Sequence, residues 1–360
     1  MDLYKHFDQI HALCGLSVFP PQRPILLKIV LAHTLLLLNA IFLWRVIRAV
    51  QNHSIVNESD HLVLFFCSMF YFQHVYRKRK LMQTFLTKIS DMLTVAEVCR
   101  CRRLSIKLIA CVVTWTVMDA SVLFLNYFEE GQWSWRRVLD IYISRRFWPA
   151  LTALPMPVKL TIVLYRHTYV ALNNNLICLM VGAYVFYLKL VQAATRRFLV
   201  NLANNHLPNR PRLAWLDLLQ LRSQLESLFS AFPLLLCAYF FFQTLVYVLA
   251  IATKAKAGHL TLYYLIWYCY YWLVSAVMTF YTVTVIDNAN EDNQAIFDII
   301  ERQTIYSRNV EVQKLVEHIA RTLPFNYTAW SLFTINKSII LGFASALVSF
   351  TVLFVQLNGL

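Results

Sequence analysis

The sequence predicts an all-α membrane protein with seven transmembrane helices, an intracellular N-terminus and an extracellular C-terminus. Apolar residues fill 59% of the 360 positions and charged residues only 14%, against about 45–50% and about 25% in soluble proteins. The net charge of +14 comes from Lys and Arg clusters that lie between apolar runs. We interpret these clusters as orientation signals and contacts to anionic lipid headgroups, and we expect no nucleic-acid partner.

A membrane-spanning helix needs about 20 mostly apolar residues. Six clear runs of this kind lie at 25–44, 62–76, 108–128, 232–252, 260–286 and 339–357. A seventh run, at 169–190, follows a stretch at 147–165 that three prolines interrupt, so the start of the fourth span stays open. In an eight-span alternative, 147–165 crosses the membrane alone, which would place the N-x-[ST] patterns at Asn326 and Asn336 outside.

The predicted orientation follows from glycosylation patterns and positive charge. Asn52 and Asn57 each begin an N-x-S acceptor pattern in the loop between the first two spans, and such sites are glycosylated on the outer side. The stretch 77–107 is rich in Lys and Arg, which favours the cytoplasm. With seven spans, the N-terminus is then inside and the C-terminus outside.

The chain divides into four parts on this reading. Residues 1–24 form a cytoplasmic N-terminal segment, and 25–286 form a six-helix ligand-binding bundle with a cytoplasmic helical extension at about 192–230. Residues 287–338 form a cytoplasmic anchor segment, and 339–360 form the last transmembrane helix. Apolar residues in the extension recur at helical spacing, which predicts a packed intracellular layer; they include Leu218, Leu221, Leu225 and Leu228.

No enzyme motif occurs in the sequence. The nucleophile pattern G-x-S-x-G, the zinc pattern H-E-x-x-H and the glycine-rich nucleotide loops are all missing, and only six glycines are present. We expect no catalytic activity, no cofactor and no metal site.

A ligand pocket is predicted from polar and aromatic residues in the spans. Asp119 lies inside the third span beside Trp115, and it either faces a ligand cavity or bonds to a neighbouring helix. Aromatic residues crowd the outer halves of the fifth and sixth spans, where a pocket competes with an interfacial belt as the explanation. The candidate pocket residues are Trp115, Asp119, Gln243, Tyr247, Tyr264, Trp267, Tyr268 and Tyr271.

The last span carries the most specific pattern. Ser349-Phe350, five residues, and then Gln356-Leu357 resemble the T-Y-h-h-h-h-h-Q-F signature that closes insect gustatory receptors, with Ser, Phe and Leu replacing Thr, Tyr and Phe. The stretch 333–338 is similar to that family's approach to its last helix. Chain length, span number and orientation extend the resemblance over essentially the whole chain.

The resemblance implies a tastant-gated, weakly selective cation channel in the plasma membrane of sensory neurons. Four identical or related receptor subunits would each contribute the last helix to a central pore, and each would bind its tastant in the extracellular half of its bundle. Leucine rings at the pore would exclude water when the channel is closed. An ordinary packed span is the alternative reading of this helix. The candidate pore and gate residues are Ser349, Leu353, Gln356 and Leu357.

Two other membrane classes compete with the channel. A G-protein-coupled receptor needs an extracellular N-terminus, which conflicts with both orientation signals. A transporter should show paired broken helices in two related halves, and only the proline-rich stretch at 149–157 qualifies. The G-protein-coupled receptor is the stronger of these alternatives.

Overall fold

The structure is a computed structural model, and it describes residues 55–94, 152–203, 211–256, 262–306, 326–329 and 332–357, with scattered positions between these ranges. Two short strands, β1 (Thr328–Ala329) and β2 (Phe333–Thr334), pair as an antiparallel hairpin just before the last helix. The helices are α3 (Ile55–Met92), α6 (Met156–Ala203), α7 (Pro211–Phe229), α8 (Ala231–Lys256), α9 (Leu262–Tyr306) and α11 (Ser338–Leu357).

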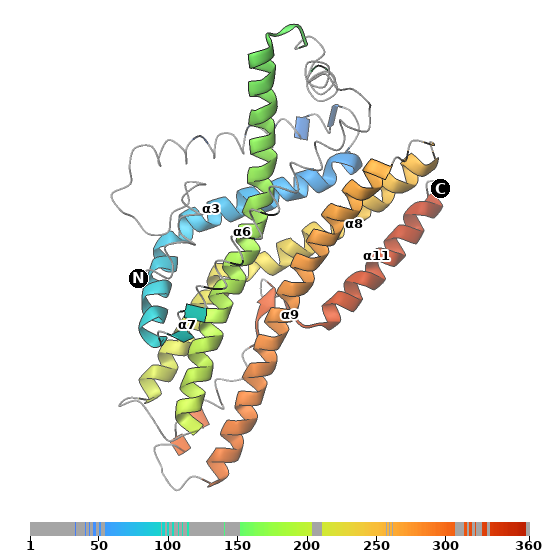
Figure 1. The fold of residues 1–360 in the computed structure, drawn as a ribbon. Coiled ribbons are helices and arrows are strands. Elements are labelled where there is room, and N and C mark those ends of the chain that lie inside the picture. The colour runs from blue at the N-terminus through green and yellow to red at the C-terminus, as the bar shows by residue number, and fades with distance from the viewer. Residues whose placement is uncertain are drawn as a thin grey trace.

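Five of the seven predicted spans coincide with these helices, and those at 25–44 and 108–128 are described at scattered positions only. Among the described residues, the stretches Leu176–Phe198, Arg212–Lys256 and Leu265–Gln294 are long and apolar enough to cross a membrane. In Figure 1, α6 and α9 run toward the bottom of the view, whereas α8 and α11 run toward the upper right. We call the end where α8 meets α9 the outer end and the opposite end the inner end, following the predicted orientation.

Helix α6 settles the open question about the fourth span. It runs without interruption from Met156 to Ala203, so the chain does not reverse between 156 and 190 and the eight-span alternative is wrong. Pro155 precedes the helix and Pro157 lies in its first turn, where a missing backbone N–H costs no hydrogen bond. At about 1.5 Å per residue, its 48 residues are far longer than a bilayer needs.

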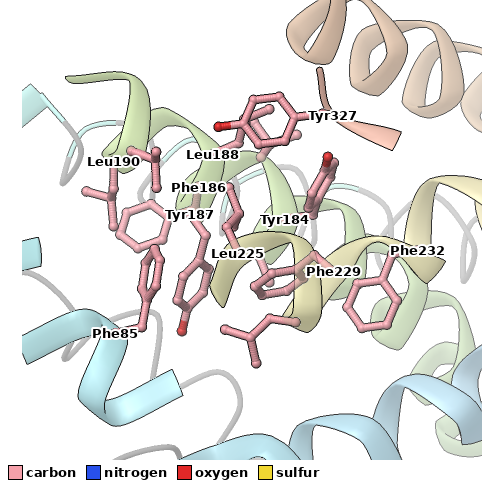
Figure 2. Packing of buried hydrophobic residues seen from close by; sticks show 14 of the residues in the cluster. Phe85, Tyr184, Phe186, Tyr187, Leu188, Leu190, Leu225, Phe229, Phe232 and Tyr327 are labelled. Atoms are coloured by element: carbon pink, nitrogen blue, oxygen red, sulfur yellow. The ribbon is translucent and has the colours of Figure 1, made fainter. Parts of the chain in front are cut away.

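The main core lies where α3, α6, α7 and the start of α8 meet (Figure 2). Phe229, at the end of α7, has its ring 4.9 Å from that of Tyr187 and 5.3 Å from that of Phe232. Phe85 of α3 packs on the other side of Tyr187, at 5.3 Å. These rings join four helices through one aromatic contact chain, with each pair at a separation typical of favourable aromatic packing.

The predicted helical stretch at about 192–230 comprises the end of α6 and the whole of α7. Its leucines Leu218, Leu221, Leu225 and Leu228 are all fully buried, together with Trp215. Their spacing of three and four residues places them on one face of α7, which faces α6 and α3. The sequence periodicity thus reflects a buried helix face.

Candidate functional site

Five predicted pocket residues come together between α8 and α9. Gln243 and Tyr247 lie one turn apart on α8, and Trp267, Tyr268 and Tyr271 lie on the facing turn of α9. The ring of Tyr247 is 5.0 Å from that of Tyr268 and 6.2 Å from that of Trp267, and the rings of Trp267 and Tyr271 are 5.2 Å apart. We call these five residues the outer aromatic cluster.

Gln243 supplies the polar chemistry of the outer aromatic cluster. Its side chain is 1% exposed, and its Nε2 donates a hydrogen bond to the Tyr247 hydroxyl at 3.0 Å. Its Oε1 is buried and accepts no hydrogen bond from the described residues. A buried acceptor without a donor is costly, so this amide is chemically suited to a molecule that brings a hydroxyl or N–H group.

A polar link between α8 and α9 was not predicted. Trp272 Nε1 donates to the Thr244 hydroxyl at 3.0 Å, and that hydroxyl donates to the Phe240 carbonyl at 2.8 Å. Trp272 is not among the predicted pocket residues, and nothing in the sequence marked Thr244 as its partner. The bond ties the two helices together at the residue that follows Gln243.

The other predicted pocket and glycosylation residues are not all described. Tyr264 lies on α9, but its side chain is outside the described set, and Trp115, Asp119 and Asn52 lie outside the described residues. Asn57 lies in the first turn of α3, which begins at Ile55. In the described part of the chain, no three His, Cys, Asp or Glu side chains converge as they would around a metal ion.

Helix α11 packs on its own chain through one face. Half-buried side chains recur at Ile340, Phe343, Leu347 and Thr351, spaced three or four residues apart. The ring of Phe343 lies 6.4 Å from that of Phe241 on α8, and α8 is the main partner of α11 among the described elements. The helix therefore lies at the edge of the bundle (Figure 1).

The predicted pore residues of α11 lie on its other face. Ser349, Leu353 and Gln356 are all exposed, with Leu353 51% exposed. The Ser349 hydroxyl donates to the Ser345 carbonyl at 3.0 Å, which satisfies the hydroxyl within the helix. Leu357 ends the helix, and its side chain is outside the described set.

The residues that hold the start of α11 were missed by sequence reasoning. Asn290 of α9 is 9% exposed; its Nδ2 donates to the Ile335 carbonyl at 2.9 Å, and its Oδ1 accepts from the Tyr327 N–H at 2.8 Å. The Ile335 N–H in turn donates to the Tyr327 carbonyl at 3.1 Å. One asparagine thus binds the residue directly before β1 and the residue directly after β2, at the base of the hairpin that leads into α11.

Helix α7 holds the same hairpin from a second side. Glu226 accepts hydrogen bonds from both the N–H (3.1 Å) and the hydroxyl of Thr328. The Arg222 guanidinium, which is fully buried, lies over the ring of Tyr327 at 5.6 Å. We call Arg222, Glu226, Asn290, Tyr327 and Thr328 the inner polar cluster. It fixes the hairpin between α7 and α9.

Two ion pairs continue this attachment to Lys337, the residue directly before α11. Lys337 lies 2.8 Å from Asp287 and 3.1 Å from Glu291, both on α9. Hydrogen bonds to Asp287 and then to Glu291 raise the pKa of the Lys337 ammonium above its usual value. Lys337 therefore stays charged at physiological pH and adds a third contact between α9 and the start of α11.

Comparison with solved structures identifies the fold. The chain is similar to the insect olfactory receptor OR5 from Machilis hrabei, with a TM-score of 0.69 and 10% sequence identity over 99% of both chains. It is also similar to the same receptor in complex with eugenol, with a TM-score of 0.60, 14% identity and the same coverage. No protein-family model matches the chain, and no curated protein matches it by sequence. The chain is thus an all-α, multi-pass membrane protein with the fold of this receptor.

Proposed function

We propose that the chain is a chemosensory receptor of the gustatory type, acting as a ligand-gated, non-selective cation channel in the plasma membrane of sensory neurons. The observation that carries the proposal is the fold likeness to OR5 over 99% of both chains. The taste assignment rests on the motif from Ser349 to Leu357, which resembles the gustatory receptor signature. No catalytic role is proposed.

In this proposal α11 lines the pore of a four-subunit assembly, made of this chain alone or with related chains. Equivalent helices around a central axis would cover its exposed face. Rings of Leu353 and Leu357 would exclude water in the closed state, while Ser349 and Gln356 offer neutral polar groups to a hydrated cation. Leu353→Ala or Leu357→Ala should then raise ligand-independent leak current, and unchanged current in both would count against a hydrophobic gate.

The outer aromatic cluster is proposed as part of the tastant site, together with Tyr264, Trp115 and Asp119. Ring faces offer stacking area, and the Gln243 carbonyl offers an acceptor for a hydroxyl. OR5 in complex with eugenol supports this choice, because eugenol is a small aromatic molecule that carries one hydroxyl. The ligand opens the pore only to the extent that it binds the open state more tightly than the closed state.

A G-protein-coupled receptor is the competing assignment and is less well supported. It requires the opposite orientation, with the Arg77 to Lys80 cluster outside the cell. The fold likeness to OR5 extends over 99% of both chains, so it accounts for the whole of the described bundle.

The test is whole-cell current in a heterologous cell that expresses this chain and no added G protein. Sugars, bitter compounds and eugenol are applied in turn, and surface expression is checked by labelling. We expect a weakly cation-selective current in response to at least one of these compounds. A response that disappears when endogenous G proteins are blocked would favour the competing assignment.

A further inference from the structure

Several described cations at the inner end of the bundle have partners within the chain. Lys88 of α3 lies 2.6 Å from Asp217 of α7, and Arg196 of α6 lies 2.6 Å from Asp292 of α9. Arg197 donates to the Met92 carbonyl at 2.8 Å. These cations connect neighbouring helices, so their charge is used within the protein.

The basic segment, Arg77 to Lys80 on α3, differs from these cations. Within the described residues, no carboxylate forms an ion pair with any of the four side chains. The guanidinium of Arg79 lies 5.2 Å from the centre of the Tyr76 ring, which is a cation–π contact within α3. Four positive charges therefore occupy about 6 Å of helix axis without an acidic partner among the described residues.

Ring contacts fix the level of the basic segment along the bundle. Phe70 and His74 of α3 pack around Phe232, at 6.1 and 5.2 Å between rings. Phe232 lies in the first turn of α8, where the fifth apolar run begins at the inner end. Arg77 follows His74 by about one helical turn, so the basic segment lies just beyond the apolar layer.

The same face of α3 changes from apolar to basic at this level. Phe66, within the apolar run, is 48% exposed, and Tyr76 at its end is 44% exposed. Arg77, the next residue, and Lys80, about one turn beyond Tyr76, are exposed as well. Along α3 the exposed residues are therefore first a phenylalanine, then a tyrosine, and then two cations. This order matches the hydrocarbon core, the interface and the headgroup layer of a bilayer.

We propose that the basic segment is a binding site for the phosphorylated headgroups of inner-leaflet phosphoinositides. Charge complementarity selects the ligand, because four clustered cations favour a headgroup with several phosphates over a zwitterionic one. Tyr76 places the segment at the depth of these phosphates. The site is separate from the proposed tastant site and pore, and it does not depend on channel activity.

Lipid binding to the purified full-length protein tests the proposal directly. Native mass spectrometry measures the affinity for phosphatidylinositol 4,5-bisphosphate and for phosphatidylcholine in the same detergent. Arg77→Gln/Lys80→Gln removes the two exposed cations of the segment. The matched control, Lys254→Gln/Lys256→Gln, removes two cations near the outer end of α8.

The expected loss is about fivefold per cation removed, so Arg77→Gln/Lys80→Gln should bind the phosphoinositide about 25-fold more weakly. The outer control should stay within about twofold of the unmodified protein. Arg77→Lys should also keep its affinity, which separates loss of charge from damage to the helix. The proposal is overturned if the outer control loses as much affinity, if the inner variant loses none, or if the unmodified protein binds both lipids equally.

Discussion

The two ends of the helical bundle are held together by different kinds of contact. At the outer end α8 and α9 meet mainly through tilted and edge-on rings. One hydrogen bond, from Trp272 to Thr244, joins the two helices there, and the hydrogen bond of Gln243 stays within α8. At the inner end the described helices are joined by directional bonds, such as those of Asn290 to the base of the hairpin. Ion pairs from α3 to α7 and from α6 to α9 add to these bonds.

This difference bears on how a ligand signal reaches the pore. Most of the stabilisation from buried ring area is non-directional, so the outer aromatic cluster can repack around a small molecule at modest cost. Buried hydrogen bonds to backbone groups fix one register, because shifting them leaves donors and acceptors unpaired. Helix α9 belongs to both regions, so it links the proposed ligand site with the attachment point of α11.

The largest expected effect comes from breaking the inner polar cluster at its centre. Asn290→Ala removes the partners of the Tyr327 N–H and the Ile335 carbonyl and should destabilise the protein by about 3 kcal/mol. Thermal unfolding of the purified protein, followed by tryptophan fluorescence, measures the change. Asn288→Ala, at an exposed position of the same helix, should stay within about 0.5 kcal/mol of the unmodified protein. Equal losses in both variants would contradict the role given to Asn290.

A substitution in the outer aromatic cluster should affect stability far less. Gln243→Leu loses the hydrogen bond to Tyr247, but it also removes a buried acceptor that has no donor among the described residues. These two effects oppose each other, so the free energy of unfolding should change by less than about 1 kcal/mol. The same variant should shift the ligand concentration for half-maximal current by about tenfold, the cost of one hydrogen bond. A loss of stability as large as that of Asn290→Ala would remove the contrast between the two ends.

The smallest effect is expected at the exposed ion pair of the inner end. Arg196→Gln removes the contact with Asp292, but the Arg196 side chain is 63% exposed, and such pairs contribute about 0.5 kcal/mol. The difference from the unmodified protein should disappear in high salt, because screening weakens exposed pairs. A salt-independent loss would mean that the contact is more protected than its exposure indicates.

The sequence predicted the features that repeat along the chain. The buried face of α7 followed from the spacing of Leu218 to Leu228, and the gathering of Gln243, Tyr247, Trp267, Tyr268 and Tyr271 followed from aromatic density on two adjacent spans. Both patterns are local, so they are visible in one sequence. Whether the five residues bind a ligand stays a prediction.

Contacts between distant residues were not predictable in the same way. Asn290 binds backbone groups 37 and 45 residues further along the chain, and any residue type can supply a backbone group. The prolines before the fourth span left two readings open, because a proline breaks the middle of a helix yet fits its first turn. Only the path of α6 distinguishes these cases.

The most direct test of the account is cysteine accessibility along α11. Ser349→Cys places a thiol on the exposed face, whereas Leu347→Cys places one on the face toward α8. A charged, thiol-reactive methanethiosulfonate applied from outside during ligand-evoked current should block the Ser349→Cys channel and leave the Leu347→Cys and unmodified channels unchanged. Block of Leu347→Cys with no effect on Ser349→Cys would contradict a pore lined by the exposed face of this helix.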